Sequence, residues 1–180
     1  MIFQNTILAN ESLGVGNYYQ GGYIAYLDLN LNQGLIVSPT DLTGSTCAWE
    51  VEPYQTITTT NTYGSGQTNT TNILASTSAT PAAELCDAYV NQGYNDWFLP
   101  NTNEMLKVFD AFNLGRLKRA NIQSSIYWTS YSLAFNTAQF VDFAIPSVYG
   151  GQVGDGFRCC GPSSPGPGAW VRACRYITFN

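Results

Sequence analysis

Two glutamates, Glu50 and Glu52, are the first candidates for chemistry, because a pair of carboxylates can supply the acid and the base of a hydrolytic reaction. Two positions apart, they would lie on one side of a strand. The chain has no histidine, the commonest general base, so the carboxylates would have to work without one. Nothing in the neighbouring sequence indicates that either glutamate is buried, and we expect both on the solvated surface.

Five cysteines offer nucleophiles or metal ligands: Cys47, Cys86, Cys159, Cys160 and Cys174. The absence of histidine and of a C-x-x-C spacing disfavours zinc, and Arg158, beside the 159/160 pair, is no base for activating a thiol. We expect buried thiols, with Cys86 on the apolar face of a helix and Cys174 within a strand. A disulfide from Cys174 to the 159/160 pair is the alternative, and the odd count leaves at least one cysteine unpaired within a monomer.

Aromatic, amide and carboxylate side chains gather late in the chain, in segments 131–137 and 147–155, which we expect to be loops. Aromatic faces stack on sugar rings and polar groups bind hydroxyl groups, and the same mixture suits a protein contact. The candidate ligand-binding residues are Tyr131, Phe135, Asn136, Tyr149, Gln152 and Asp155. The alternative is that the aromatic side chains pack beneath the loops.

Composition limits the classes of partner. The length of 180 residues suits a single domain over 1–180, and 44% apolar with 11% charged residues is too apolar for disorder. A net charge of -5 would repel a phosphate backbone, so nucleic acid is not an expected partner. No apolar run approaches the roughly 20 residues of a membrane span. Residues 1–5 lack the basic and apolar regions of a secretory signal, so we expect none.

Periodicity and turn residues predict the elements that position these side chains. We expect strands over 22–28 and 35–38 as a hairpin, an exposed loop over 56–71, and a short helix around 69–76. A helix over 81–92 would have Thr80 as its N-cap, and another would begin at Asn101 with Glu104 completing a capping box. That last helix would bury Met105, Phe109 and Phe112.

Beyond residue 119, aromatic and β-branched residues predict strands over 126–129, 138–143 and 169–179. The Gly-Pro-rich segment 161–168 can neither be helical nor pair in a sheet. Two main helices packed on an antiparallel sheet, with long loops in the C-terminal third, make an α+β fold.

Segment 93–105, Gly-Tyr-Asn-Asp-Trp-Phe-Leu-Pro-Asn-Thr-Asn-Glu-Met, combines a turn, an apolar stretch and a helix start. Gly93 would end the preceding helix with positive φ, Asp96 would form a turn hydrogen bond, and Trp97 would join the core. The pattern G-x-x-D-W-x-L-P with a following cap and Glu resembles the C-terminal domain of collagen-like bacterial surface adhesins, the Lcl C-terminal family. Further landmarks match in order over nearly the whole chain: 19–22, 24–28, 34–39, 127–130 and 171–175.

The resemblance implies a C-type-lectin-like fold, which phage receptor-binding proteins also use, with Trp128, Arg172 and Arg175 in the framework. The resemblance also implies that the chain is not an enzyme. The superfamily does include the formylglycine-generating enzymes, but their two cysteines are separated in sequence, whereas Cys159 and Cys160 are adjacent here. C-type lectins bind calcium, but Glu52-Pro53 is followed here by an aromatic residue instead of an amide ligand. We expect no cofactor, and a calcium site from carbonyls and Asp155 stays the alternative.

We therefore expect a non-catalytic recognition or attachment module on a particle surface, above all a phage virion decoration or fibre-tip protein. It would bind a glycan or a host-surface receptor and be made in the host cytoplasm without a signal peptide. The first alternative is a capsid or fibre cement protein, whose loops bury against other virion proteins or other copies in a homo-oligomer. The second is a bacterial cell-surface adhesin.

Overall fold

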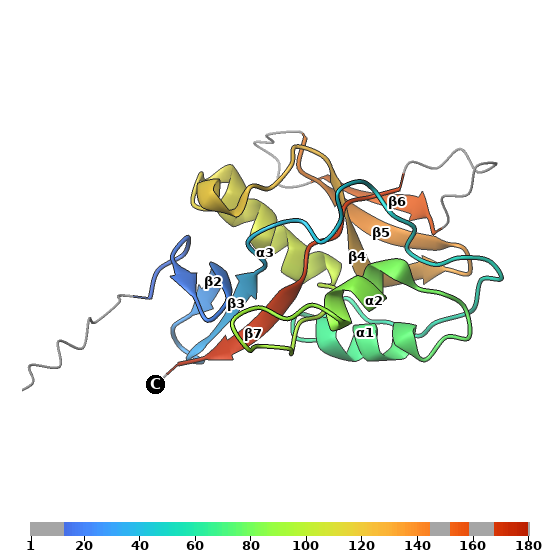
Figure 1. Cartoon of the computed structure of the whole chain (residues 1–180), viewed down its shortest axis with the longest axis horizontal. Helices are drawn as coiled ribbons and strands as arrows, with labels where there is room; N and C mark the ends of the chain where they lie inside the picture. Colours follow the sequence, from blue (N-terminus) through green and yellow to red (C-terminus); the bar gives the residue numbers. More distant parts are fainter. Residues whose placement is uncertain (1–12, 145–151, 159–167, 180) are drawn as a thin grey trace, which may run out of the picture.

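The structure is a computed structural model that describes residues 13–144, 152–158 and 168–179. Within these ranges the chain forms three α-helices and two antiparallel sheets, an α+β architecture (Figure 1). The first sheet has the order β1-β2-β3-β7, with the strands Tyr18–Tyr19, Gly22–Asp28, Gln33–Val37 and Cys174–Thr178. The second sheet has the order β4-β5-β6, with the strands Ile126–Ala134, Thr137–Asp142 and Gln152–Phe157.

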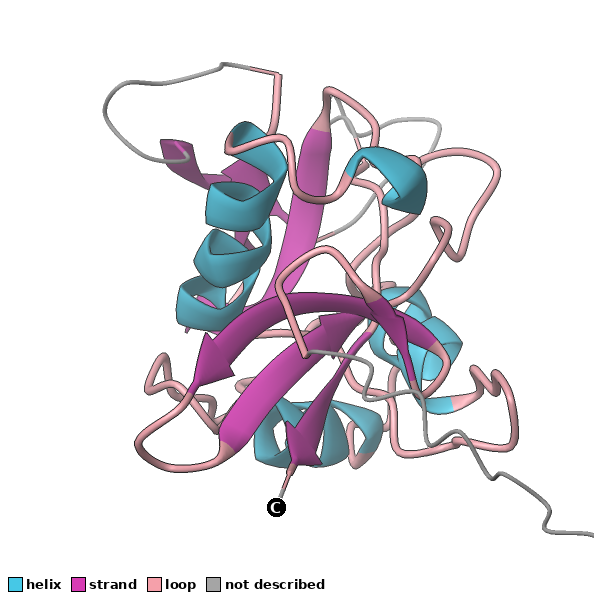
Figure 2. Cartoon of the chain, turned by 90° about the vertical axis from the view of Figure 1, so that its left-hand side faces the viewer, coloured by secondary structure: helices cyan, strands magenta, loops and turns pink. Residues whose placement is uncertain are grey.

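The helices connect the two sheets along the chain. They are α1 (Gly66–Leu74), α2 (Pro81–Asp87) and α3 (Thr102–Asn113), followed by a short 3-10 turn at Lys118–Ala120. Helix α3 packs against β2 of the first sheet and against β4 and β5 of the second. The first sheet is strongly curved, with a bulge in β2 between Ile24 and Tyr26 (Figure 2).

The early hairpin and the start of α3 confirm the sequence predictions. Strands β2 and β3 pair as an antiparallel hairpin. At Asn101, the side chain accepts a hydrogen bond from the Glu104 N–H at 3.0 Å, and the Glu104 carboxylate accepts one from the Asn101 N–H at 2.8 Å. Met105 and Phe109 of α3 are buried as expected, Phe112 is half-buried, and Trp97 lies in the core.

The predicted helix over 81–92 is wrong at its C-terminal end. Helix α2 stops at Asp87, since Asn91 and Tyr94 exchange backbone hydrogen bonds of 3.0 and 3.1 Å across a turn. Gly93 does have positive φ, +84°, but it lies in this turn and does not end the helix. Thr80 stands at the N-cap of α2 without a side-chain cap bond, and α1 begins at Gly66, three residues before the expected start.

The C-terminal third is β as predicted, but its strands are arranged differently. The expected strand over 169–179 is a strand only from Cys174 to Thr178, because Ala169 and Trp170 form isolated bridges with Cys47 and Tyr127. Strand β7 joins the first sheet beside β3 rather than the late one. Part of the expected loop 147–155 is strand β6, which pairs with β5 along its whole length.

Candidate functional site

The β4–β5 hairpin ends in a two-residue turn that carries exposed aromatic surface. Phe135 is 58% exposed, and its ring meets the ring of Tyr54 edge-on at 6.2 Å. Leu133 precedes the turn, and Phe157 of β6 lies opposite Thr137, which follows the turn. We call the following residues the tip surface: Tyr54, Leu133, Phe135, Asn136 and Phe157.

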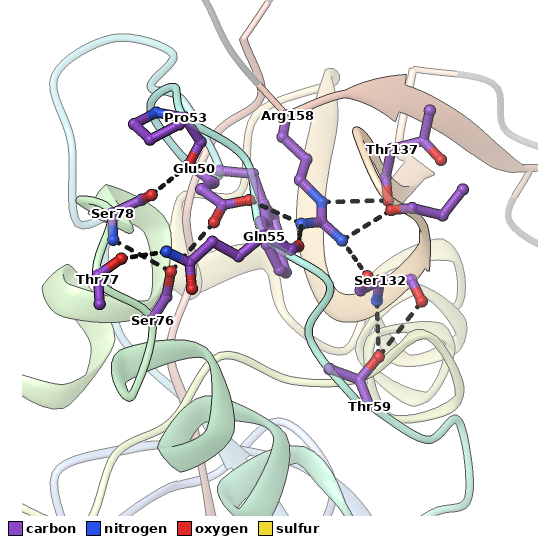
Figure 3. A network of polar contacts seen from close by, with 12 residues as sticks. Glu50, Pro53, Gln55, Thr59, Ser76, Thr77, Ser78, Ser132, Thr137 and Arg158 are labelled. Carbon is purple, nitrogen blue, oxygen red and sulfur yellow. Dashed lines mark hydrogen bonds and ion pairs between the residues drawn. The ribbon is translucent and has the colours of Figure 1, made fainter.

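The side chain of Arg158 holds the turn from beneath (Figure 3). Its guanidinium donates to the carbonyl of Ala134 at 2.8 Å and to that of Thr137 at 3.4 Å, on either side of the turn. The Arg158 N–H donates to the Asn136 carbonyl at 3.0 Å, and the guanidinium also contacts the Ser132 hydroxyl. A planar guanidinium has several donors in fixed directions and can therefore bind several backbone carbonyls at once.

Glu50 neutralises the buried guanidinium. Its carboxylate is 2.7 Å from the Arg158 guanidinium, and both side chains are fully buried. The other carboxylate oxygen accepts a hydrogen bond from the Ser76 hydroxyl at 3.2 Å, while the Gln55 carbonyl accepts from Arg158 at 2.8 Å. The ring of Trp49 lies 4.5 Å from the guanidinium and covers it from the core.

The prediction that Glu50 is a solvated surface residue is therefore wrong, whereas Glu52 is exposed as predicted. The segment is not a strand, so the two carboxylates do not share a strand face. Glu50 follows Trp49 in a loop, and its partner is 108 residues away. No local pattern could have revealed the pair. Together Glu50 and Arg158 connect the loop at 49–55 to the hairpin and fix the backbone under the tip surface.

The structure brings only part of the predicted site together. Phe135 and Asn136 form the turn, and Tyr131 is half-buried further back in β4. Asp155 is exposed and lies opposite Gln139, from whose amide it accepts a hydrogen bond at 3.3 Å. Gln152 stands at the other end of β6, roughly 16 Å from Phe157 at the usual rise per residue. Tyr149 lies outside the described residues.

Tyr131, Gln152 and Asp155 were expected in loops. This expectation is wrong, because Tyr131 belongs to β4 and the other two belong to β6. Sequence reasoning missed Tyr54, Leu133 and Phe157 as neighbours of Phe135. The alternation of Val153, Asp155 and Phe157 could have indicated a strand with these three side chains on one face. Tyr54 carries no such signal, because a loop places it there.

Metal and thiol chemistry find little support in the described ranges. No group of three histidine, cysteine, aspartate or glutamate side chains there could hold a metal ion. Burial raises the pKa of the Cys86 and Cys174 thiols well above the ordinary value, so both are protonated at neutral pH and poor nucleophiles. Both are free thiols, as expected, so the alternative of a disulfide at Cys174 is wrong. Cys159 and Cys160 lie outside the described residues.

Two other arginines hold the framework, as the resemblance implies. Arg172 is buried and donates to Asp41 at 2.8 Å and to the carbonyl of Ala120 at 2.7 Å. Arg175 binds the Asp96 carboxylate through two nitrogens, at 2.6 and 2.9 Å. Asp96 therefore forms an ion pair with a strand 79 residues away, which corrects the expectation of a local turn bond.

Comparison with models of known families and with curated proteins finds no match for the chain. Within the described ranges, no helix combines the length and the apolar character needed to cross a membrane.

Proposed function

We propose that this chain is a non-catalytic recognition module that binds a glycan or another host-surface receptor through the tip surface. The observation that carries the proposal is the exposed ring of Phe135, which lies on a turn fixed by Arg158 and meets the half-buried ring of Tyr54. Aromatic rings give a large contact area at low cost in side-chain entropy, and a backbone already fixed reduces the ordering cost of binding.

The surface also has the mixed chemistry that glycans require. Phe135 offers an aromatic face, on which the C–H groups of a sugar ring can pack, and the Asn136 amide beside it can donate to and accept from hydroxyl groups. Asp155 and Gln139 add a carboxylate and an amide two positions further along the sheet. Asp155 supplies the one formal charge among these side chains, which disfavours an acidic ligand and suits an uncharged one.

The proposal includes membership of the Lcl C-terminal family with a C-type-lectin-like fold, displayed on a virion surface. The support is the segment at 93–105, of which residues 97–102 are buried. Phe98 exchanges backbone hydrogen bonds of 2.8 and 2.9 Å with Cys174 of β7, and Asp96 pairs with Arg175. The motif that carries the resemblance therefore joins the middle of the chain to its last strand.

The test is a binding assay of the purified chain on an array of bacterial and mucosal polysaccharides. We expect Phe135→Ala to weaken binding about tenfold or more, as the loss of a central aromatic contact does. The matched control is Leu114→Ala, which removes another strongly exposed apolar side chain at the end of α3. Equal binding by both variants, or no binding to any polysaccharide by the folded chain, would defeat the proposal.

A structural cement protein is the second candidate, and exposed apolar residues favour it. Leu133, Val153 and Phe157 are 47%, 39% and 54% exposed on the second sheet. Burial of such side chains against a neighbouring subunit stabilises an assembly. Analytical ultracentrifugation combined with hydrogen exchange distinguishes the two: a monomer with an unprotected hairpin at 133–137 supports recognition, and an oligomer that protects it supports cement.

A further inference from the structure

A pocket of about 380 Å³ lies on the first sheet, away from the tip surface. It is bounded by β7, by the β2–β3 turn and by the loop that precedes α1. Its lining includes Leu31, Gln33, Tyr63, Gly64, Tyr176 and Thr178. None of the lining residues carries a charge, and the volume lies within the range of small-ligand sites, roughly 300–1,000 Å³.

The aromatic walls of this pocket are fixed by contacts behind them. The rings of Tyr63 and Tyr176 are 6.2 Å apart, and the ring of Tyr176 packs on Phe98 at 4.4 Å. The Tyr176 hydroxyl donates to the buried carboxylate of Glu104, which also accepts from the Gly64 N–H at 2.9 Å. The wall is thus formed before any ligand arrives, which lowers the ordering cost of binding.

Polar side chains lie around these rings. Gln33 and Thr178 are exposed at the rim. The Tyr63 hydroxyl is buried and finds no hydrogen-bond partner in the described part of the chain. Because this hydroxyl is buried, the hydrogen bonds to a ligand would come from Gln33 and Thr178 at the rim.

Strand β7 adds backbone groups at its outer edge. Cys174 directs its N–H and C=O to Phe98, and the Phe179 N–H donates to Asn32. By the alternation of an antiparallel ladder, the N–H and C=O of Tyr176 and Thr178 therefore point away from β3. No hydrogen bond from the described residues occupies them.

We propose that this pocket is a second binding site, which takes a neutral sugar ring. The rings of Tyr63 and Tyr176 would pack on the apolar face of the sugar, and Gln33, Thr178 and the edge of β7 would bind its hydroxyl groups. The buried Glu104 carboxylate behind Tyr176 and the absence of a lining cation disfavour an acidic sugar. The inference rests on the proposed function only for the class of ligand, because its residues are separate from the tip surface.

The test uses the ¹⁵N-labelled full chain, titrated with the methyl glycosides of glucose, galactose and mannose, and with methyl glucuronide. We expect at least one neutral glycoside to shift the amides of Gly64 and Thr178 with a Kd of about 1 mM, and the glucuronide to bind more weakly. Gln33→Ala and Thr178→Val should each weaken binding about threefold to tenfold, as the loss of one hydrogen bond does. Phe135→Ala should leave the shifts unchanged.

Three results would overturn the second site: no shift at Gly64 or Thr178 with any neutral glycoside, unchanged affinity in both Gln33→Ala and Thr178→Val, or shifts confined to 133–137. The last result would leave the proposed function intact, since it would place sugar binding at the tip surface alone. Conversely, shifts at the pocket together with a negative polysaccharide array would retain the second site and defeat the tip surface. Because Gln33 is exposed, its substitution tests binding without threatening the fold.

Discussion

At the scale of single residues, Arg158 is the side chain on which the candidate site depends most. It is fully buried, and only Glu50 among the described residues neutralises it. A buried ion pair contributes little net stability compared with apolar residues of the same size, but removal of one partner leaves the other charge buried and uncompensated. The Arg158 guanidinium also fixes the carbonyls of Ala134 and Thr137 on either side of the turn, so its loss should affect both stability and the shape of the tip surface.

We predict that Arg158→Met lowers the free energy of unfolding by about 3–5 kcal/mol, because Glu50 is left buried without a counter-charge. Urea unfolding followed by circular dichroism measures this change. The matched control is Arg119→Met, an exposed arginine, which should change it by less than about 0.5 kcal/mol. Arg158→Met should also speed amide exchange at 133–137. A free energy of unfolding within about 1 kcal/mol of that of the parent chain would contradict the role of Arg158 as the support of the turn.

Glu104 provides a prediction on pH. Burial raises the pKa of its carboxyl above the ordinary value of 4.5, while hydrogen bonds from Tyr176, Asn101, Gly64 and Gly66 oppose the rise. A carboxyl whose pKa is raised by folding contributes most stability when it is protonated in both states. That contribution is full below pH 4.5 and is lost as the pH rises through the raised pKa of the folded chain.

We therefore expect the stability advantage of the parent chain over Glu104→Gln to be largest at acid pH and to narrow toward neutrality, by at most about 1.4 kcal/mol per pH unit. Urea unfolding of both chains across the pH range measures the difference. The control is Glu52→Gln, an exposed carboxylate, measured in the same way. An advantage that grows as the pH rises would show instead that the four hydrogen bonds outweigh burial.

At the scale of elements, the start or end of a helix could be predicted from the sequence where the contact that fixes it joins residues close together in the chain. The start of α3 could be predicted because Asn101 and Glu104 are three residues apart and complete their bonds within one turn. The end of α2 could not, because it depends on a turn in which the Asn91 amide donates to the Gly21 carbonyl, 70 residues earlier. Strand β6 is harder to predict, because Gly154 and Gly156 disfavour a strand although Val153, Asp155 and Phe157 alternate with them.

The two N-caps allow a matched test. We predict that Asn101→Ala lowers the free energy of unfolding by about 1–2 kcal/mol, because the Glu104 N–H loses its acceptor at the start of α3. Thr80→Ala should cost less than half as much, because Thr80 makes no side-chain cap bond. Thermal and urea unfolding of both variants give the comparison. Equal losses would mean that the capping box contributes no more than an ordinary polar side chain.

The candidate site shows the same dependence on distance. Phe135 and Asn136 could be selected from the sequence because they are adjacent and share one turn. Their supports could not: Arg158 reaches the hairpin from beyond β6, and Glu50 and Tyr54 come from a loop in the first half of the chain. Sequence patterns therefore indicated the type of surface, but only the packing of distant segments shows what fixes it.

At the scale of the whole molecule, both hydrophobic clusters include residues from both sheets. One cluster joins Ile24 and Ile36 of the first sheet to Trp128 and Ala138 of the second. The other joins Leu35 and Val37 to Tyr127 and Val141, with the apolar face of α3 between them. Neither sheet can therefore expose its inner face without exposing part of the other, and strand β7 couples the end of the chain to the early hairpin.

This shared core predicts that the chain unfolds as one cooperative unit. Ile36→Val in β3 should lower the free energy of unfolding by about 0.5–1.5 kcal/mol and Val141→Ala in β5 by about 1–3 kcal/mol. Each should accelerate amide exchange equally in both sheets. Native-state hydrogen exchange by NMR measures the two sheets separately, and circular dichroism should show a single transition. If a substitution in one sheet accelerated exchange in that sheet alone, the chain would consist of two independent units. Recognition at the tip would then be separable from the pocket on the first sheet.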